Sequence, residues 1–489
     1  MASDVEGKIY LKYWVDTKEE RVVMAESSGD FINVLFSFLT LPLGTIIRLG
    51  NRLDQRVDLG CINHLYESIE KLESDVFWNN ICKKMLLSPR NPLEGSCQRL
   101  KVKVDDTEPT KYYMCHNCLK KGSNELLLSS FIDVKCKCGT LMRKEIDMVE
   151  EAAGDNGVFV KGDAKFLIYD DLTVLRSSPS ESIKPPLKFG YTEFKNMKEK
   201  YLDRNEILII LKQALTSKSP LTDVLVKMGE PKPQNCFLPD MSSSDSKDFV
   251  QIKVIVRKSN NRILFVEADG DFVDFLASIL TTPLGSILNL SEDILSLGSI
   301  RNLYQSVKNL DSSWFIESSK KSLLNPKVNP HFGCVRNLLN VSQDVVSEYW
   351  YGLGVMKDGK GHVLWEKKMI SKKQDMLQNP KAIKLLDPRS SDGVRKHEVG
   401  FMKRPCLFVM SDDLKVLPMT TTSSIPGPFM KGVPLDDLKE HLVKMRKPQA
   451  LNLLRASLTS NKDAFTRSLF FLLMKWQFQR FIPFGRCVQ

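Results

Sequence analysis

Two stretches of the chain, separated by nearly half of its length, carry apolar side chains in the same order. They are residues 29–44, GDFINVLFSFLTLPLG, and residues 270–285, GDFVDFLASILTTPLG. The spacing i, i+3, i+4, i+7, i+8 is typical of an amphipathic helix. The first stretch has this spacing at Phe31, Val34, Leu35, Phe38 and Leu39, and the second has it at Phe272, Phe275, Leu276, Ile279 and Leu280. Each stretch is therefore predicted to form a helix with one buried face.

The residues around each stretch predict how the helix begins and ends. Asp30 and Asp271 stand where an N-cap is expected, because a carboxylate there accepts hydrogen bonds from free amide groups. Pro42 and Pro283 are expected to end the helices, since proline lacks the N–H and clashes with the preceding turn. The glycines that follow are expected to permit a turn.

Upstream and downstream segments repeat in the same order. Alternating apolar residues around a polar turn predict a β-hairpin before each helix, over residues 9–15 with 21–26 and residues 251–256 with 262–267. Further matching pairs are residues 61–72 with 299–310, 83–92 with 320–330, 166–175 with 407–417, and 208–218 with 451–461. So long a period indicates two tandem domains, because solenoid repeats are only about 20–50 residues long.

The predicted fold is therefore α+β, with two tandem repeated domains. Each is expected to hold a mixed or antiparallel sheet with helices on one face, opening with a hairpin and then a helix. The first repeat is expected over residues 1–228 and the second, with a divergent C-terminal tail, over residues 249–489. Residues 229–248, rich in Pro, Ser and Asp, are the predicted linker.

Four cysteines fall close together in the first repeat. Cys115 and Cys118 form a CxxC pair, and Cys136 and Cys138 form a CxC pair that is followed by a glycine. Two such pairs can complete a tetrahedral zinc site, which predicts a zinc-ribbon-like insertion over residues 110–145. With four thiolates no position stays open for water, so the one zinc ion is expected to be structural.

Two alternatives remain for this segment. His116 would be a weaker ligand because it leaves one cysteine spare, and the CxC pair has a less forgiving geometry than CxxC. Four free thiols are the other interpretation, although clustered thiols without a metal would be prone to oxidation. The second repeat has no such cysteines, and its Tyr349, Trp350, Tyr351 and Trp365 are expected to pack where the metal organises the first repeat.

Other polar groups do not form a clear reactive site. The pairs Asp170-Asp171 and Asp412-Asp413 would suit general acid/base chemistry, but apolar strand on both sides favours a hairpin turn. No histidine recurs at an equivalent place, no phosphate-binding loop is present, and Cys97 and Cys334 match as expected buried thiols. The basic group Lys367, Lys368, Lys372 and Lys373 is expected to be a solvated face.

Composition and charge place the chain among globular proteins. It is 42% hydrophobic and 26% charged, and its net charge of +11 is spread along the chain, which favours weak attraction to polyanions over a dedicated nucleic-acid surface. The N-terminus has no apolar leader, and residues 31–47 are shorter than the ~18–20 residues of a spanning helix. Eleven cysteines, an odd number, suggest thiols or metal ligands in a reducing compartment. We expect a cytoplasmic protein, with the nucleus as a second compartment.

The paired motifs GDFxxxLxxxLTxPLG, LYxS(I/V)xxL, DDLxVL and LTS together resemble the plant family known as the domain of unknown function 674. The resemblance covers nearly the whole chain and implies a plant source and tandem copies, but no activity, substrate or cofactor. What repeats is apolar stripes, turns and caps, so we expect a non-catalytic interaction or scaffold protein with unidentified protein partners. The alternatives are a nucleic-acid-binding protein that uses the zinc ribbon and basic surface, and an enzyme that uses the paired Asp residues.

Overall fold

The protein is described here from a computed structural model. It describes residues 7–16, 18–53, 56–123, 125–149, 157–188, 197–227, 248–291, 297–334, 336–357, 363–389, 400–419, 430 and 432–478. The predicted linker, except for its last residue, lies outside these residues, as does the tail after residue 478. The described part is a mixed α+β structure with four sheets.

The first five-stranded sheet opens with the predicted hairpin. Its strand order is β10-β1-β2-β8-β9, and neighbouring strands run antiparallel. The strands are β1 (Ile9–Asp16), β2 (Arg21–Ser28), β8 (Lys165–Tyr169), β9 (Val174–Arg176) and β10 (Met197–Leu202). Alternate residues of β1 are buried, as the period-2 pattern predicts.

The second five-stranded sheet repeats this arrangement. Its order is β18-β11-β12-β16-β17, again antiparallel. The strands are β11 (Val250–Arg257), β12 (Arg262–Asp269), β16 (Leu407–Ser411), β17 (Val416–Pro418) and β18 (Leu438–Met445). Both hairpins also have a shift in strand register at a similar place, after Trp14 in β1 and after Ile255 in β11. The two hairpins therefore correspond strand by strand.

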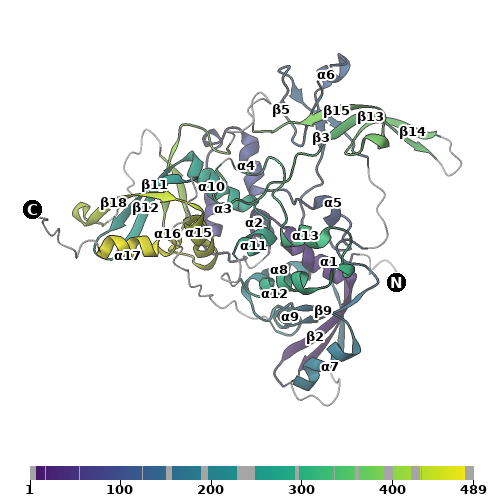
Figure 1. Cartoon of the computed structure of the whole chain (residues 1–489), viewed down its shortest axis with the longest axis horizontal. Helices are drawn as coiled ribbons and strands as arrows, with labels where there is room; N and C mark the ends of the chain where they lie inside the picture. Colours follow the sequence, from purple (N-terminus) through teal and green to yellow (C-terminus); the bar gives the residue numbers. More distant parts are fainter. Residues whose placement is uncertain are drawn as a thin grey trace, which may run out of the picture.

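The helices lie mainly between these two sheets (Figure 1). We call the chain before the predicted linker the first half and the chain after it the second half. The first half contributes α1 (Gly29–Ser37), η1 (Phe38–Thr40), α2 (Leu43–Gly50), α3 (Cys61–Lys71), η2 (Ser74–Val76), α4 (Asn80–Leu87), α5 (Glu94–Cys97), α7 (Pro179–Lys188), α8 (Arg204–Thr216) and α9 (Pro220–Leu225). The second half contributes α10 (Gly270–Thr281), α11 (Leu284–Leu290), α12 (Ile300–Asn309), η3 (Ser312–Trp314), α13 (Ser319–Leu324), α15 (Lys447–Thr459), α16 (Ala464–Ser468) and α17 (Phe470–Phe478). The second half also has the short 3₁₀ turns η4 (Gln374–Met376) and η5 (Leu435–Asp437), and one further helix, α6, lies in the insertion described below. No helix among the described residues is long and apolar enough to cross a membrane.

The helix starts differ from the sequence prediction by two residues. The N-caps are Ser28, whose side chain accepts from the backbone N–H of Asp30, and Asp269, which accepts from those of Asp271 and Phe272. Asp30 and Asp271 lie instead in the first turn, where a negative charge favours the helix dipole. The predicted caps are therefore wrong, because the two glycines themselves adopt helical geometry and move the start upstream.

Pro42 and Pro283 do stand where each amphipathic helix has ended, but the glycines after them make no turn. Both prolines are N-caps of the next helices, α2 and α11, which contain the glycines. The two prolines form an antiparallel bridge with each other. Around it, Leu43 N donates to Thr282 O (3.2 Å) and Leu284 N to Leu41 O (2.9 Å). The two copies of the motif thus meet at the centre of the molecule.

Helices of each half pack against the sheet of the other half. The helix α3 contacts β17, and α12 contacts β9. The two contacts use equivalent hydrogen bonds, from Val416 N to Ser68 Oγ (3.1 Å) and from Val174 N to Ser306 Oγ (2.8 Å). One apolar cluster accordingly runs through residues of both halves. The core is not divided at the predicted linker.

A six-stranded sheet projects from the helical region, at the top right of Figure 1. Its order is β14-β13-β15-β4-β3-β7. The insertion of the first half supplies β3 (Tyr112–Met114), β4 (Leu127–Ser129) and β7 (Lys144–Ile146), and the second half supplies β13 (Tyr349–Lys357), β14 (Val363–Ser371) and β15 (Gln378–Leu385). The halves join where β15 pairs in parallel with β4. A separate apolar cluster, which includes Tyr112 and Tyr349, fills this sheet.

Candidate metal centre

The four predicted cysteines lie on two loops of the insertion. Cys115 follows β3 directly and is the N-cap of α6 (His116–Lys120), whose first turns carry Cys118. Cys136 and Cys138 lie between β5 (Val134–Lys135) and β6 (Leu141–Met142), a two-stranded hairpin. The CxxC pair is therefore presented by a strand-to-helix junction and the CxC pair by a hairpin tip.

The hairpin tip is held by its own backbone. Gly139 N donates to Cys136 O (2.8 Å), and Cys136 N donates to Thr140 O (2.9 Å). Gly139 has φ +86°, in the left-handed region that glycine adopts without strain. This tight turn brings the two sulfur atoms of a CxC pair to one side, which answers the geometric concern raised by the sequence.

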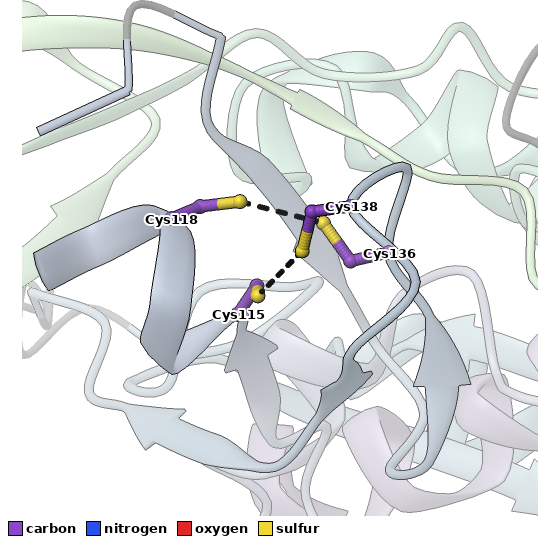
Figure 2. Close-up of side chains that lie close together, drawn as sticks. All are labelled: Cys115, Cys118, Cys136 and Cys138. Carbon is purple, nitrogen blue, oxygen red and sulfur yellow. Dashed lines mark hydrogen bonds between the residues drawn. The ribbon is translucent and has the colours of Figure 1, made fainter. Parts of the chain in front are cut away.

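The four sulfur atoms point toward one another (Figure 2) and all lie within 4.8 Å of each other. The closest approaches cross between the loops, at 3.4 Å for Cys115 and Cys138 and 3.7 Å for Cys118 and Cys136. Zinc–sulfur bonds of about 2.3 Å in a tetrahedron place sulfur atoms about 3.8 Å apart. The donor set and its spacing therefore fit a single tetrahedral ion.

The protonation of these thiols differs around the cluster. The backbone N–H and the hydroxyl of Thr140 lower the pKa of Cys138 to about 6, which favours the thiolate at neutral pH. Burial, and then the neighbouring thiols, raise the pKa of Cys118, and burial likewise raises that of Cys136. A bound cation favours the thiolate form, so metal binding would release protons from these two sites.

Thr140 is a supporting residue that sequence reasoning missed. Besides its bonds to Cys138, its Oγ1 accepts from Asn117 Nδ2 (2.9 Å), which joins the hairpin tip to α6. Such outer partners fix the orientation of ligating side chains. The only sequence signal was the position of Thr140 two residues after Cys138.

The other predicted ligand, His116, is exposed on α6 and is not part of the cluster. Within the described residues, the four cysteines form the one group of His, Cys, Asp and Glu side chains with metal-binding geometry. Tyr349 does pack beside the insertion, with its hydroxyl 3.1 Å from that of Tyr112. The side chain of Trp365 lies outside the described part.

The paired Asp residues form the predicted hairpin turns. Asp170 lies between β8 and β9, where it accepts from the backbone N–H and the hydroxyl of Thr222 (2.8 and 2.7 Å). Asp412 does the same for Thr466 (2.8 and 2.6 Å). Burial raises the pKa of both carboxyls to about 6. Each carboxylate thus joins its hairpin to the start of a short helix, α9 or α16.

The matched cysteines Cys97 and Cys334 are partly buried and packed against the core, not fully buried as predicted, and desolvation raises the pKa of each thiol to about 12. A thiol with so high a pKa is a poor nucleophile. The basic residues Lys367, Lys368, Lys372 and Lys373 are exposed on and just after β14, as predicted for a solvated face.

Comparison with known proteins agrees with the resemblance seen in the sequence. Neither a curated protein nor a solved structure matches the chain. A family profile described as "Protein of unknown function (DUF674)" matches residues 5–448, which include both five-stranded sheets and all four clustered cysteines. The chain therefore belongs to the DUF674 family.

Proposed function

We propose that Cys115, Cys118, Cys136 and Cys138 bind one structural zinc ion, and that the protein is a non-catalytic interaction or scaffold protein. The observation that carries the zinc proposal is that four sulfur atoms from two loops lie within 4.8 Å of one another. Four thiolates occupy every position of a tetrahedral ion, so no site is left for water or substrate. Thiolates also favour zinc over harder cations such as magnesium or calcium.

The cluster lies beside the six-stranded sheet, so a bound ion would stabilise the strands that the first half adds to that sheet. Cys115 follows β3, which pairs with β4, and β4 in turn pairs with β15 of the second half. The insertion itself has only short strands, and its apolar residues are divided between a small cluster and the main core, which includes Leu127, Phe131 and Met142. Small units with little core of their own usually need a metal or a disulfide. Zinc would therefore hold the first half's share of a sheet that both halves build.

We propose a scaffold role because the repeated polar groups serve the fold. Asp170 and Asp412 hold helix starts, and Ser68 and Ser306 join the halves. We also propose that residues 1–228 and 249–489 are copies of one unit, which the matching strand orders support. The nine cysteines in the described residues are all free, which supports a reducing compartment such as the cytoplasm or nucleus.

The decisive measurement is the zinc content of the purified full-length protein. We expect about one equivalent per chain by elemental analysis. Cys115→Ser and Cys136→Ser, one from each loop, should each lower this to below about half an equivalent. They should also increase hydrogen exchange in β3, β4 and β15, because the loops are no longer held together.

Cys406→Ser is the control, since Cys406 is a free, half-buried cysteine that lies outside the cluster. It should keep full zinc content and normal exchange. Wild-type protein with less than about half an equivalent of zinc, and no change in Cys115→Ser, would reject the site. A nucleic-acid role, for which the exposed lysines on β14 and around the cluster are the only support, would show as binding to polyanions that weakens steeply with salt.

A further inference from the structure

A cavity of about 740 Å³ lies where the two halves meet. One wall is α3 with η2 of the first half, including His64, Leu72 and Val76. The other wall is β17 and the loop before β16, including Lys403, Pro405 and Pro418. Its volume is in the range of small-molecule sites, about 300–1,000 Å³.

The corresponding place in the other half can be identified by its hydrogen bonds. At the cavity, Lys403 N donates to Val76 O (2.8 Å), and at its counterpart Lys161 N donates to Trp314 O (3.1 Å). Phe77 bridges Met402 in one case, and Phe315 bridges Val160 in the other. Val76 therefore corresponds to Trp314.

The cavity and its counterpart therefore differ first in having Val76 in place of Trp314. A second difference lies in the strand after each hairpin turn. Counting from the paired Asp residues, Pro418 on β17 corresponds to Arg176 on β9. At the counterpart, the Arg176 guanidinium stacks over the Trp314 indole, 4.3 Å from the ring centre. The cavity is thus the place where both members of a cation–aromatic pair have been replaced by smaller, uncharged side chains.

Three carboxylates and three lysines line the cavity, so the pairing of these groups decides which charges are left for a ligand. Lys415 is bound to Asp413 (2.7 Å), and Lys71 lies 3.9 Å from Glu67. Glu73 and Asp75 also line the cavity and are exposed, and neither forms an ion pair with another of the described residues. Asp75 stands where the counterpart has the uncharged Ser313. Among the described residues, the carboxylates of Glu73 and Asp75 therefore line the cavity without an ion pair, as does the ammonium group of Lys403, while Lys71 shares Glu67 with Arg56.

We propose that this cavity binds a small aromatic amine. Its ring would occupy the space that Trp314 fills in the other half, against Leu72, Val76 and Pro418, and its ammonium group would lie near Glu73 and Asp75. A cavity in which apolar side chains such as these lie beside charged groups from both walls can fix the orientation of a bound molecule. The cavity is separate from the metal centre, and this proposal does not depend on zinc.

The test is calorimetric titration of the full-length protein with tryptamine. We expect saturable binding of about one molecule per chain. Tryptophol, which has the same ring and an uncharged hydroxyl, should bind about tenfold more weakly, and indole-3-propionate more weakly still. No saturable heat with tryptamine at millimolar concentration would overturn the proposal.

Two sets of variants separate the ring from the charge. Val76→Trp with Pro418→Arg rebuilds the pair seen in the other half and should abolish tryptamine binding. Glu73→Gln with Asp75→Asn alters exposed residues only, and should weaken tryptamine about tenfold while leaving tryptophol unchanged. Asp163→Asn, an exposed carboxylate beside the counterpart, is the control and should bind tryptamine normally. Unchanged binding in the Glu73/Asp75 variant, whether or not the filled variant folds, would reject this site.

Discussion

Asn33 and Asp274 are buried polar side chains at the same position of the two amphipathic helices. Asn33 Oδ1 accepts from the backbone N–H groups of Phe159 and Val160, both at 2.8 Å. Asp274 Oδ1 accepts from those of Phe401 and Met402, also at 2.8 Å. The second half adds a charge to this arrangement, since Arg404 Nη2 donates to Asp274 Oδ2 (2.6 Å). Burial raises the pKa of Asp274 to about 6 although Arg404 opposes the shift.

Substitutions at these two positions should therefore show a graded effect. Asn33→Ala or Asp274→Ala leaves two buried amide donors without an acceptor and should cost about 2–4 kcal/mol in the free energy of unfolding. Asp274→Asn keeps an acceptor, as in the first half, and should cost about 1 kcal/mol. Urea denaturation measures each value. Asp30→Ala is the control: its half-buried carboxylate lies in the first turn of α1 and 3.6 Å from Lys101 Nζ, so the expected change is at most about 1 kcal/mol. A loss in this control as large as in Asn33→Ala would contradict the role assigned to the buried acceptor.

The pH dependence of the same variants follows from the raised pKa. Between the ordinary Asp pKa of about 4 and about 6 in the folded protein, the folded state binds more protons than the unfolded state. Asp274 therefore contributes a loss of stability as the pH rises through this range. Asp274→Asn should remove that part of the slope.

Residue chemistry was readable from the sequence where it depends on local spacing. The four cysteines and the Asp turns are of this kind, because ligand spacing and strand-turn-strand patterns lie within a few residues. The roles of Asn33, Asp274 and Thr140 were not readable, since their partners lie elsewhere in the chain or depend on the turn that Gly139 adopts.

Among the helices, Gly44 and Gly285 lie where backbone atoms of their own half and of the other half come close. A Cβ atom on Gly44 would lie 2.9 Å from Leu86 O and 3.1 Å from Leu280 O. On Gly285 it would lie 2.7 Å from Leu323 O and 3.0 Å from Leu39 O. These obstacles are backbone atoms, which cannot rotate away as a side chain can.

Gly44→Ala and Gly285→Ala should each lower the free energy of unfolding by about 1–3 kcal/mol, because the added Cβ atom would press on backbone oxygens of the same half and of the other half. Thermal and urea unfolding measure this. Gly95→Ala, on the short helix α5 with nothing within 4 Å of the added atom, is the matched control and should be neutral or stabilising by up to about 1 kcal/mol. If all three variants were equally stable, the close approach at Pro42 and Pro283 would be disproved.

The sequence predicted the existence and order of these elements, including both hairpins and the paired helices. It did not predict that α3 lies on β17 and α12 on β9. An apolar stripe shows which face of a helix is buried but not which neighbour covers it. The exchange of helices between the halves was for this reason visible only in the structure.

At the level of the whole molecule, each half depends on the other for its core. Cys61 N of the first half donates to Ser460 O of the second half, and Ser299 N of the second half donates to Ala214 O of the first, both at 2.8 Å. A half made alone would expose the apolar faces of β8–β9 or β16–β17 and of the helices that cover them. Domains are only marginally stable, so losing this burial should be decisive.

We therefore expect residues 1–238 and residues 239–489, made separately, to be insoluble or unfolded. Produced together, they should associate and give the circular dichroism spectrum and zinc content of the intact protein, because the linker makes no part of the described core. Co-purification of the two pieces checks this. A soluble, cooperatively folding single half would show instead that the exchanged helices are not needed.

The six-stranded sheet is built from two different inserts, residues 112–146 of the first half and residues 349–385 of the second half. One brings cysteines and short strands, and the other brings a long hairpin without cysteines, yet they meet edge to edge where β4 pairs with β15. Because the two edge strands pair with each other, a change in the length or register of one strand requires a matching change in the other. Within the described residues the latter half holds no metal cluster, so the two segments contribute unlike but complementary parts to one sheet.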